Sequence, residues 1–138
     1  MSVLDWCLIE LNLEGCGITS DLLLRTKLKA KRISLVGNYL CERAAPAIAD
    51  IVGRCEEIDL SANKLSDKFM QTFVIEIDVI PCSLKRIGLE YTDVSEKGLM
   101  LVCCALESHF TNLQQVDCDV ICEELVSQVY LQQWKLTD

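Results

Sequence analysis

The sequence is poor in the residues that build most catalytic and nucleic-acid-binding sites. Its 138 residues include one His, two Pro and 13 Lys plus Arg against 21 Asp plus Glu, for a formal net charge of −8. Phosphate backbones and anionic membrane surfaces are bound mainly by clustered cations, so this charge disfavours both as partners. There is also no run of 18 apolar residues, and residues 1–5 lack the basic start of a secretory signal. We therefore expect a cytoplasmic protein, with the nucleus as the alternative compartment.

The sequence motifs of common enzymes are missing as well. The chain has no Gly-x-x-x-x-Gly-Lys-Ser/Thr, Gly-x-Gly-x-x-Gly, Gly-x-Ser-x-Gly or His-Glu-x-x-His. These patterns bind phosphates, position a nucleophilic serine or hold a catalytic zinc ion. The single histidine, His109, is expected near the end of a helix, where the helix dipole favours its protonated form. We predict no catalytic activity and no cofactor.

Cysteine is abundant, with nine residues, but the number is odd and most of them alternate with aliphatic residues. We interpret them as small, reduced core residues in a reducing compartment. A zinc site needs four ligands, and the chain has no pair of Cys-x-x-Cys motifs, so no metal is predicted; Cys118-x3-Cys122 with His109 remains a weak alternative. The adjacent Cys103 and Cys104 leave a second alternative, a thiol redox sensor.

One eleven-residue pattern recurs along the chain: Leu-x-x-Leu-x-Leu-x-x-(Asn/Cys/Thr)-x-Leu. Its copies begin at Leu8, Ala30, Cys55, Leu84 and Leu113, which gives steps of 22, 25, 29 and 29 residues. Apolar residues two apart within a copy, such as Ile33 and Leu35, point to one face of a short strand. Parallel stacking of five such strands would bury that face.

After each predicted strand the apolar period changes from two towards 3.6, which indicates helices. Ser66-Asp67 and Ser95-Glu96 are typical helix starts, and Pro46 requires its helix to begin within a turn before it. The first repeat has room for about one turn at residues 21–24, and a final helix over about 123–134 is expected to cover the last strand. The predicted buried stripes are Ala45, Ile48, Ala49 and Val52; Phe69, Phe73, Val74 and Ile77; and Leu99, Val102, Cys103, Leu106 and Phe110.

These copies resemble the leucine-rich-repeat family, and the longer ones are similar to its ribonuclease-inhibitor-like subclass. The resemblance covers roughly residues 8 to 118. It implies an α/β fold in a single domain, residues 1–138: a short right-handed horseshoe solenoid of about five parallel strands with helices on the convex side. It also implies a non-catalytic protein-protein interaction module, such as an adaptor, scaffold or inhibitor-like subunit.

Similar arrays occur in Ran GTPase-activating proteins and in tropomodulin. The alternative function is therefore a regulator of a small GTPase or of actin filament ends. For the GTPase regulator, Arg43 is the residue that we nominate to act on the nucleotide.

The ninth position of the pattern lies where the chain leaves the strand and turns inward. A small side chain that hydrogen-bonds to backbone is needed at such a turn, because buried backbone groups must be paired. We therefore assign structural roles to the residues at this position: Cys16, Asn38, Asn63 and Thr92.

The outward positions of the predicted strands are rich in charge. The third positions, Glu10, Arg32, Glu57, Arg86 and Gln115, form a ladder in which charges of opposite sign neutralise each other across strands about 4.8 Å apart. The fifth and seventh positions bring the total on this surface to seven acids against two arginines. Ser34, Ser61 and Gly88 are expected to leave its middle open, and Tyr39 and Tyr91 lie near its rim as candidate anchors.

We therefore predict an acidic concave surface that binds a protein with a basic segment. The predicted contact residues are Glu14, Arg32, Glu57, Asp59, Arg86, Glu90, Tyr91, Asp117 and Asp119. The basic run over residues 25–32 is a second candidate patch. Only seven residues precede Leu8, with Val3, Leu4 and Trp6 among them, so the N-terminal end is a further candidate for docking or self-association.

Overall fold

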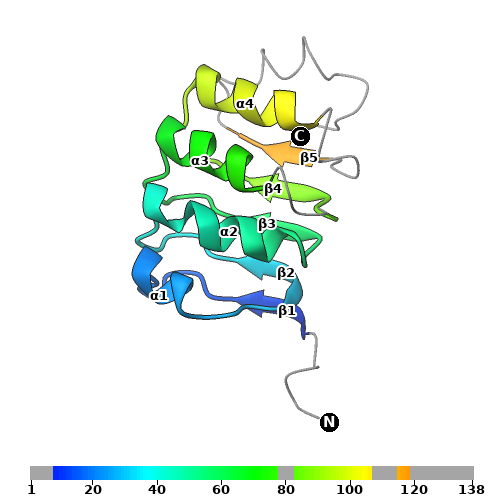
Figure 1. Cartoon of the computed structure of the whole chain (residues 1–138). Coiled ribbons are helices and arrows are strands. Elements are labelled where there is room, and N and C mark those ends of the chain that lie inside the picture. Colours follow the sequence, from blue (N-terminus) through cyan, green and yellow to red (C-terminus); the bar gives the residue numbers. More distant parts are fainter. Residues whose placement is uncertain (1–7, 78–82, 107–114, 119–138) are drawn as a thin grey trace.

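Five short parallel strands form the single sheet of this computed structural model, which describes residues 8–77, 83–106 and 115–118 (Figure 1). The strands are β1 (Leu8–Asn12), β2 (Ala30–Ser34), β3 (Glu57–Asp59), β4 (Arg86–Gly88) and β5 (Gln115–Asp117). They lie side by side in sequence order, β1-β2-β3-β4-β5, and every neighbouring pair is parallel. The predicted α/β class with five parallel strands is confirmed.

The register of the sheet aligns equivalent positions of the repeated pattern. The third positions pair in one continuous row, Glu10 to Arg32, Arg32 to Glu57, Glu57 to Arg86 and Arg86 to Gln115. The fourth positions form the next row, and those of β2 to β5 are almost completely buried. The period of two therefore divides the strand residues between a core row and an outward row, as predicted.

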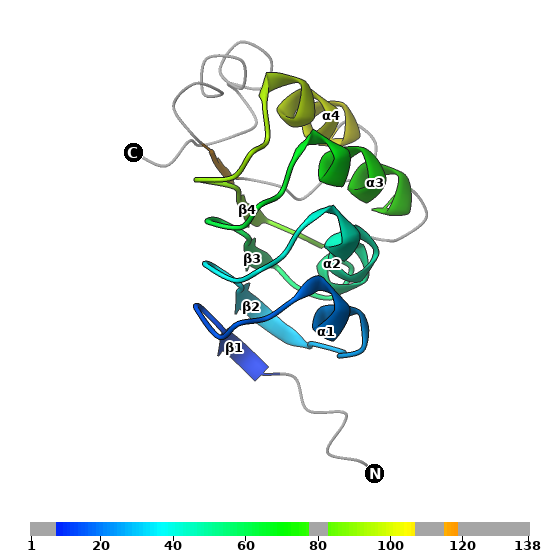
Figure 2. The same cartoon turned by 90° about the vertical axis from the view of Figure 1, so that its left-hand side faces the viewer.

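Helices follow the first four strands and lie on one side of the sheet (Figure 2). They are α1 (Ser20–Leu24), the 3-10 turn η2 (Glu42–Ala44) that continues into α2 (Ala45–Val52), α3 (Asp67–Ile77) and α4 (Glu96–Leu106). No helix described by the structure covers the opposite face of the sheet (Figure 2).

The helix starts follow local side-chain chemistry. α3 and α4 begin at the predicted Ser-Asp and Ser-Glu pairs, and Pro46 lies in the first turn of α2, where its missing N–H is harmless. α1 begins at Ser20, one residue earlier than predicted, because the hydroxyl of Thr19 caps it by accepting from the Leu22 N–H at 3.1 Å.

The core lies between the sheet and the helices. Phe69 and Phe73 are fully buried on α3, with stacked rings whose centroids are 5.5 Å apart. The predicted α2 stripe and Leu99 of α4 are also buried, and Val74 is half-buried. The side chains of Val102, Cys103, Cys104 and Leu106 lie outside the described set, as do His109, Phe110 and the predicted helix at 123–134.

Four cysteines have described side chains, and none of these four forms a disulfide bond: Cys16, Cys41, Cys55 and Cys118. Cys55 is buried as a core residue, whereas Cys16 is exposed. Cys7, Cys82 and Cys122 lie outside the described residues, and so does the arrangement of the weak zinc alternative. Within the described ranges no three His, Cys, Asp or Glu side chains gather as metal ligands, and none of the helices there has the length and apolar character to cross a bilayer.

Candidate functional site

The face of the sheet opposite the helices is the candidate site, and we call it the open sheet face. It is formed by the third, fifth and seventh positions of the pattern. A shallow hollow of about 190 Å³ lies on it, lined by residues of β1 to β4. Because small-molecule pockets usually enclose about 300–1,000 Å³, this hollow suits one side chain of a protein partner better than a cofactor. Its lining residues are Glu10, Leu11, Asn12, Arg32, Ile33, Ser34, Glu57, Ile58, Asp59 and Arg86.

The four charged side chains at the third positions in the hollow form two cross-strand ion pairs. Arg32 lies 3.4 Å from Glu10, and Arg86 lies 3.6 Å from Glu57. All four side chains are more than a third exposed, so each pair contributes only a few tenths of a kcal/mol to stability. These charges are accessible to a partner.

Arg86 is also bound to Asp117 on the neighbouring strand. Its Nε donates to Asp117 Oδ2 at 2.9 Å, its Nη2 donates to the same oxygen, and the Gln115 amide donates to Asp117 Oδ1 at 2.9 Å. Burial acts to lower the pKa of Arg86, but the hydrogen bond and charge of Asp117, with the charges of Asp59 and Glu57, outweigh it and raise that pKa. Arg86 therefore stays charged.

Asp117 was predicted to be an accessible contact residue, but its side chain is buried. Its side chain is only 4 % exposed, and the guanidinium of Arg86 reaches across from β4 to bind it. The residue stabilises the sheet, and Arg86 is the group of this pair that a partner can reach. Asp119 lies outside the described residues.

The predicted gap at Gly88 is filled by a neighbouring side chain, and Ser61 is itself buried. A Cβ atom at Gly88 would lie 2.3 Å from Oδ1 of Asp59, so the space left by the glycine holds the Asp59 carboxylate. That oxygen accepts from the Ser61 N–H at 3.0 Å. Ser61 is buried and its hydroxyl accepts from the Glu90 N–H at 3.0 Å. Of the three small residues, only Ser34 lines the hollow.

The turns that follow the strands share one left-handed conformation at the eighth position of the pattern. Gly15, Gly37, Ala62 and Tyr91 have φ values of 63°, 68°, 57° and 56° there. Residues other than glycine are disfavoured in this left-handed region by about 1–2 kcal/mol, because they carry a Cβ atom. Tyr91 nevertheless occupies it with its side chain 78 % exposed, and Tyr39 on another turn is 73 % exposed. Both tyrosines are therefore accessible to solvent.

The left-handed conformation of Ala62 predicts how a glycine at this position changes stability. Replacing Ala62 with Gly removes the Cβ strain, and we expect the free energy of unfolding in urea to rise by about 0.5–1 kcal/mol. Ala47→Gly, at the third residue of α2, is the control and should lower it by about 1 kcal/mol. A loss of stability in Ala62→Gly would contradict the described turn.

Asn38 connects its turn to the preceding one. Its Oδ1 accepts from the backbone N–H groups of Cys16 and Ile18 at 3.1 and 2.9 Å. Its Nδ2 donates to the carbonyls of Leu13 and Leu35 at 3.0 and 2.9 Å. The amide therefore pairs four backbone groups of two successive turns.

The other ninth-position residues are not all equivalent. Asn63 repeats the bridge one turn later, with Oδ1 accepting from Leu40 N–H and Nδ2 donating to Leu35 O. Thr92 bonds within its own turn, because its hydroxyl is too short to reach further. Cys16 was expected to turn inward, but it is exposed and its thiol lies 3.6 Å from the Glu14 carbonyl oxygen of its own turn.

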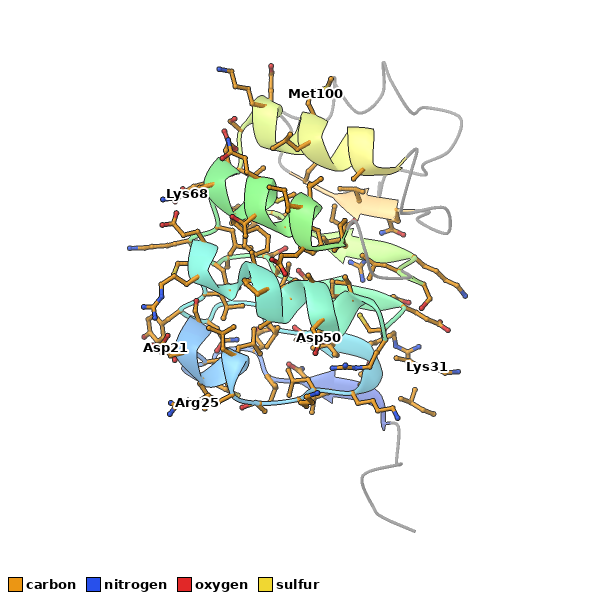
Figure 3. All side chains as sticks on the ribbon, in the orientation of Figure 1. Asp21, Arg25, Lys31, Asp50, Lys68 and Met100 are labelled. Carbon is orange, nitrogen blue, oxygen red and sulfur yellow. The ribbon has the colours of Figure 1, made fainter. Side chains whose placement is uncertain are left out.

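Two other sequence candidates lie elsewhere. Arg43 is in η2 and its guanidinium forms an ion pair with Asp21 of α1. In the basic run, Arg25 and Lys31 are exposed and lie at opposite sides of the molecule (Figure 3). The run is therefore spread along the α1–β2 connection rather than gathered in one patch.

Comparison of the chain with models of known protein families and with curated proteins finds no match.

Proposed function

We propose that this chain is a leucine-rich-repeat solenoid that acts as a non-catalytic adaptor, binding a basic segment of another protein on the open sheet face. Several features support the solenoid. The pattern recurs every 22 to 29 residues, the strands are parallel in sequence order, and helices follow on one side. In such a horseshoe the open sheet face is the concave surface.

The excess of acids on the open sheet face is the observation that carries the proposal. Among the described third, fifth and seventh positions there are six acids and two arginines. The arginines are already paired with Glu10, Glu57 and Asp117. In the described part of the chain no ion pair involves the other three acids, Glu14, Asp59 and Glu90. A cationic partner would neutralise them, and their field would accelerate its association.

The form of the face favours a protein segment as the ligand. The hollow is too small to enclose a typical cofactor, whereas it extends across four strands. Exposed tyrosines on the adjoining turns are typical anchors of protein interfaces. An extended chain can place one basic side chain in the hollow and its neighbours against the turns.

A charge-reversal experiment tests this proposal. We expect a fluorescent peptide of alternating Arg and Ser to bind the wild-type chain, with an affinity that falls as salt is added. The double substitution Glu14→Lys and Glu90→Lys should weaken binding about tenfold, because both side chains are exposed on the proposed site. Fluorescence anisotropy measures the affinity.

The matched control changes the same net charge on the helical side. Glu76→Lys with Glu96→Lys alters two exposed acids of α3 and α4 and should leave the affinity within about twofold. Equal losses in the two double variants would mean that bulk charge, not the open sheet face, attracts the peptide.

A further inference from the structure

The first strand–helix unit is less buried than the units that follow it. Leu11 and Leu13 of this unit are half-buried, whereas Ile33 and Leu35, at the same positions of the next unit, are 3 % and 0 % exposed. Ile9 on β1 is 62 % exposed. The difference arises because β2 flanks β1 on one side and no described strand flanks it on the other.

The backbone N–H groups of the later strands indicate which hydrogen-bond acceptor is missing at the outer edge of β1 among the described residues. On β4 and β5 the third-position N–H donates to the residue just before the preceding strand: Arg86 to the Glu56 carbonyl and Gln115 to the Lys85 carbonyl, both at 3.1 Å. The equivalent donor on β1 is the N–H of Glu10. It points towards the side of β1 where the described residues provide no acceptor.

Backbone carbonyls repeat this arrangement. The fifth-position carbonyl of each later strand accepts from the preceding unit, as Ser34 O does from Leu13 N–H at 2.9 Å and Asp59 O does from Leu35 N–H at 2.9 Å. The equivalent acceptor on β1 is the carbonyl of Asn12. β1 therefore presents a donor and an acceptor spaced for one more parallel strand.

We propose that the outer edge of β1 binds an extended segment of a partner protein as an additional parallel strand, with a Lys or Arg opposite Glu10 and apolar residues on either side of it. The charged row supports the cation: its signs alternate over Glu10, Arg32, Glu57 and Arg86. The carboxylate of Glu10 is 67 % exposed. The apolar residues on either side of the partner's Lys or Arg would cover Ile9 and Leu11.

The turn after β1 indicates that the occupant of the outer edge is a single strand rather than a complete further strand–helix unit. Asn38 and Asn63 each bind the preceding turn through their amides. Cys16 stands at the same position of the first unit, without an amide and with its thiol next to its own turn. The occupant is therefore held by the backbone of β1 rather than by the turn.

The charges of β1 and β5 argue against a second copy of this chain as the occupant. Antiparallel pairing of two β1 strands centred on Glu10 would place two carboxylates opposite each other, which is destabilising. Stacking of β5 from another copy on β1 would bring Gln115 and Asp117, and no cation, to Glu10 and Asn12. A partner with a basic residue between apolar ones fits better.

The test uses a peptide with the sequence of residues 30–37 in which Val replaces Lys31, Ala-Val-Arg-Ile-Ser-Leu-Val-Gly, because this segment contains the strand that pairs with β1 on its other side and the change places apolar residues on both sides of the arginine. In the full 15N-labelled chain, we expect about 1 mM peptide to shift the amide signals of Glu10 and Asn12 and to slow exchange of the Glu10 N–H. A peptide with Arg32→Glu should bind about fivefold more weakly. Glu10→Lys should reverse this preference, whereas the control Glu76→Lys should keep it.

Four results would overturn the proposal. The first is no change at Glu10 and Asn12, and the second is equal binding of both peptides. The third is a set of shifts centred on β3 and β4, which would mark the open sheet face instead. The fourth is an edge that is already occupied in the free chain, seen as strong protection of the Glu10 N–H or as a dimer by light scattering.

Discussion

Replacing Asn63 with Ala is expected to lower the free energy of unfolding by about 3 kcal/mol. The Asn63 side chain is buried; it accepts from Leu40 N–H at 3.1 Å and donates to the carbonyls of Leu35 and Leu60 at 2.9 and 3.1 Å. Alanine would leave these buried backbone groups without their partner, and each loss costs about 1–3 kcal/mol. Because Asn63 binds two successive turns, the substitution weakens the contact between units. Urea unfolding followed by circular dichroism measures the effect.

Asn12→Ala is the matched control for this prediction. Asn12 is exposed, and its side chain accepts a hydrogen bond from the Glu14 N–H at 3.0 Å. Water can replace that bond, so the expected loss is about 0.5 kcal/mol. If the two substitutions cost the same, the amide of Asn63 does not connect the turns in the way described.

Replacing Arg86 with Met is expected to cost about 3 kcal/mol in unfolding free energy. The substitution keeps the aliphatic stem but leaves the carboxylate of Asp117, which is 4 % exposed, without its guanidinium. Asp117→Leu should cost less, about 1–2 kcal/mol, because Arg86 is 37 % exposed and retains Glu57 at 3.6 Å. Chemical denaturation of the two variants distinguishes these costs.

The double variant completes this thermodynamic cycle. In the double variant no buried carboxylate loses its guanidinium, so Arg86→Met with Asp117→Leu should be less destabilised than the sum of the single variants by about 1–3 kcal/mol. Additive losses would show that the two residues do not interact across β4 and β5.

Strand positions and register could be predicted from the sequence because they depend on local periodicity. Ile33, Ile58 and Ile87 each stand at the fourth position of the pattern, and the structure pairs them in one buried row. The helix starts at Asp67 and Glu96 were equally predictable, since serine and an acid favour a free helix N-terminus.

The composition of the open sheet face was predicted less well, because it depends on how side chains reach across strands. Alternation places Asp117 outward, but only the three-dimensional structure shows that it is buried and bound by Arg86. The open space expected at Gly88 is likewise filled by Asp59 from the neighbouring strand. One signal was available for Cys16: the cysteine differs from the asparagines at the same position of the next two turns, and no described turn precedes it.

Binding to the open sheet face is tested most directly by the amide chemical shifts of the 15N-labelled chain during titration with the Arg-Ser peptide. We expect the largest changes on residues of this face, such as Glu14, Arg32, Glu57 and Glu90, and we expect them to disappear at high salt. Changes centred on α3 and α4, or none at peptide concentrations up to about 1 mM, would contradict binding to this face.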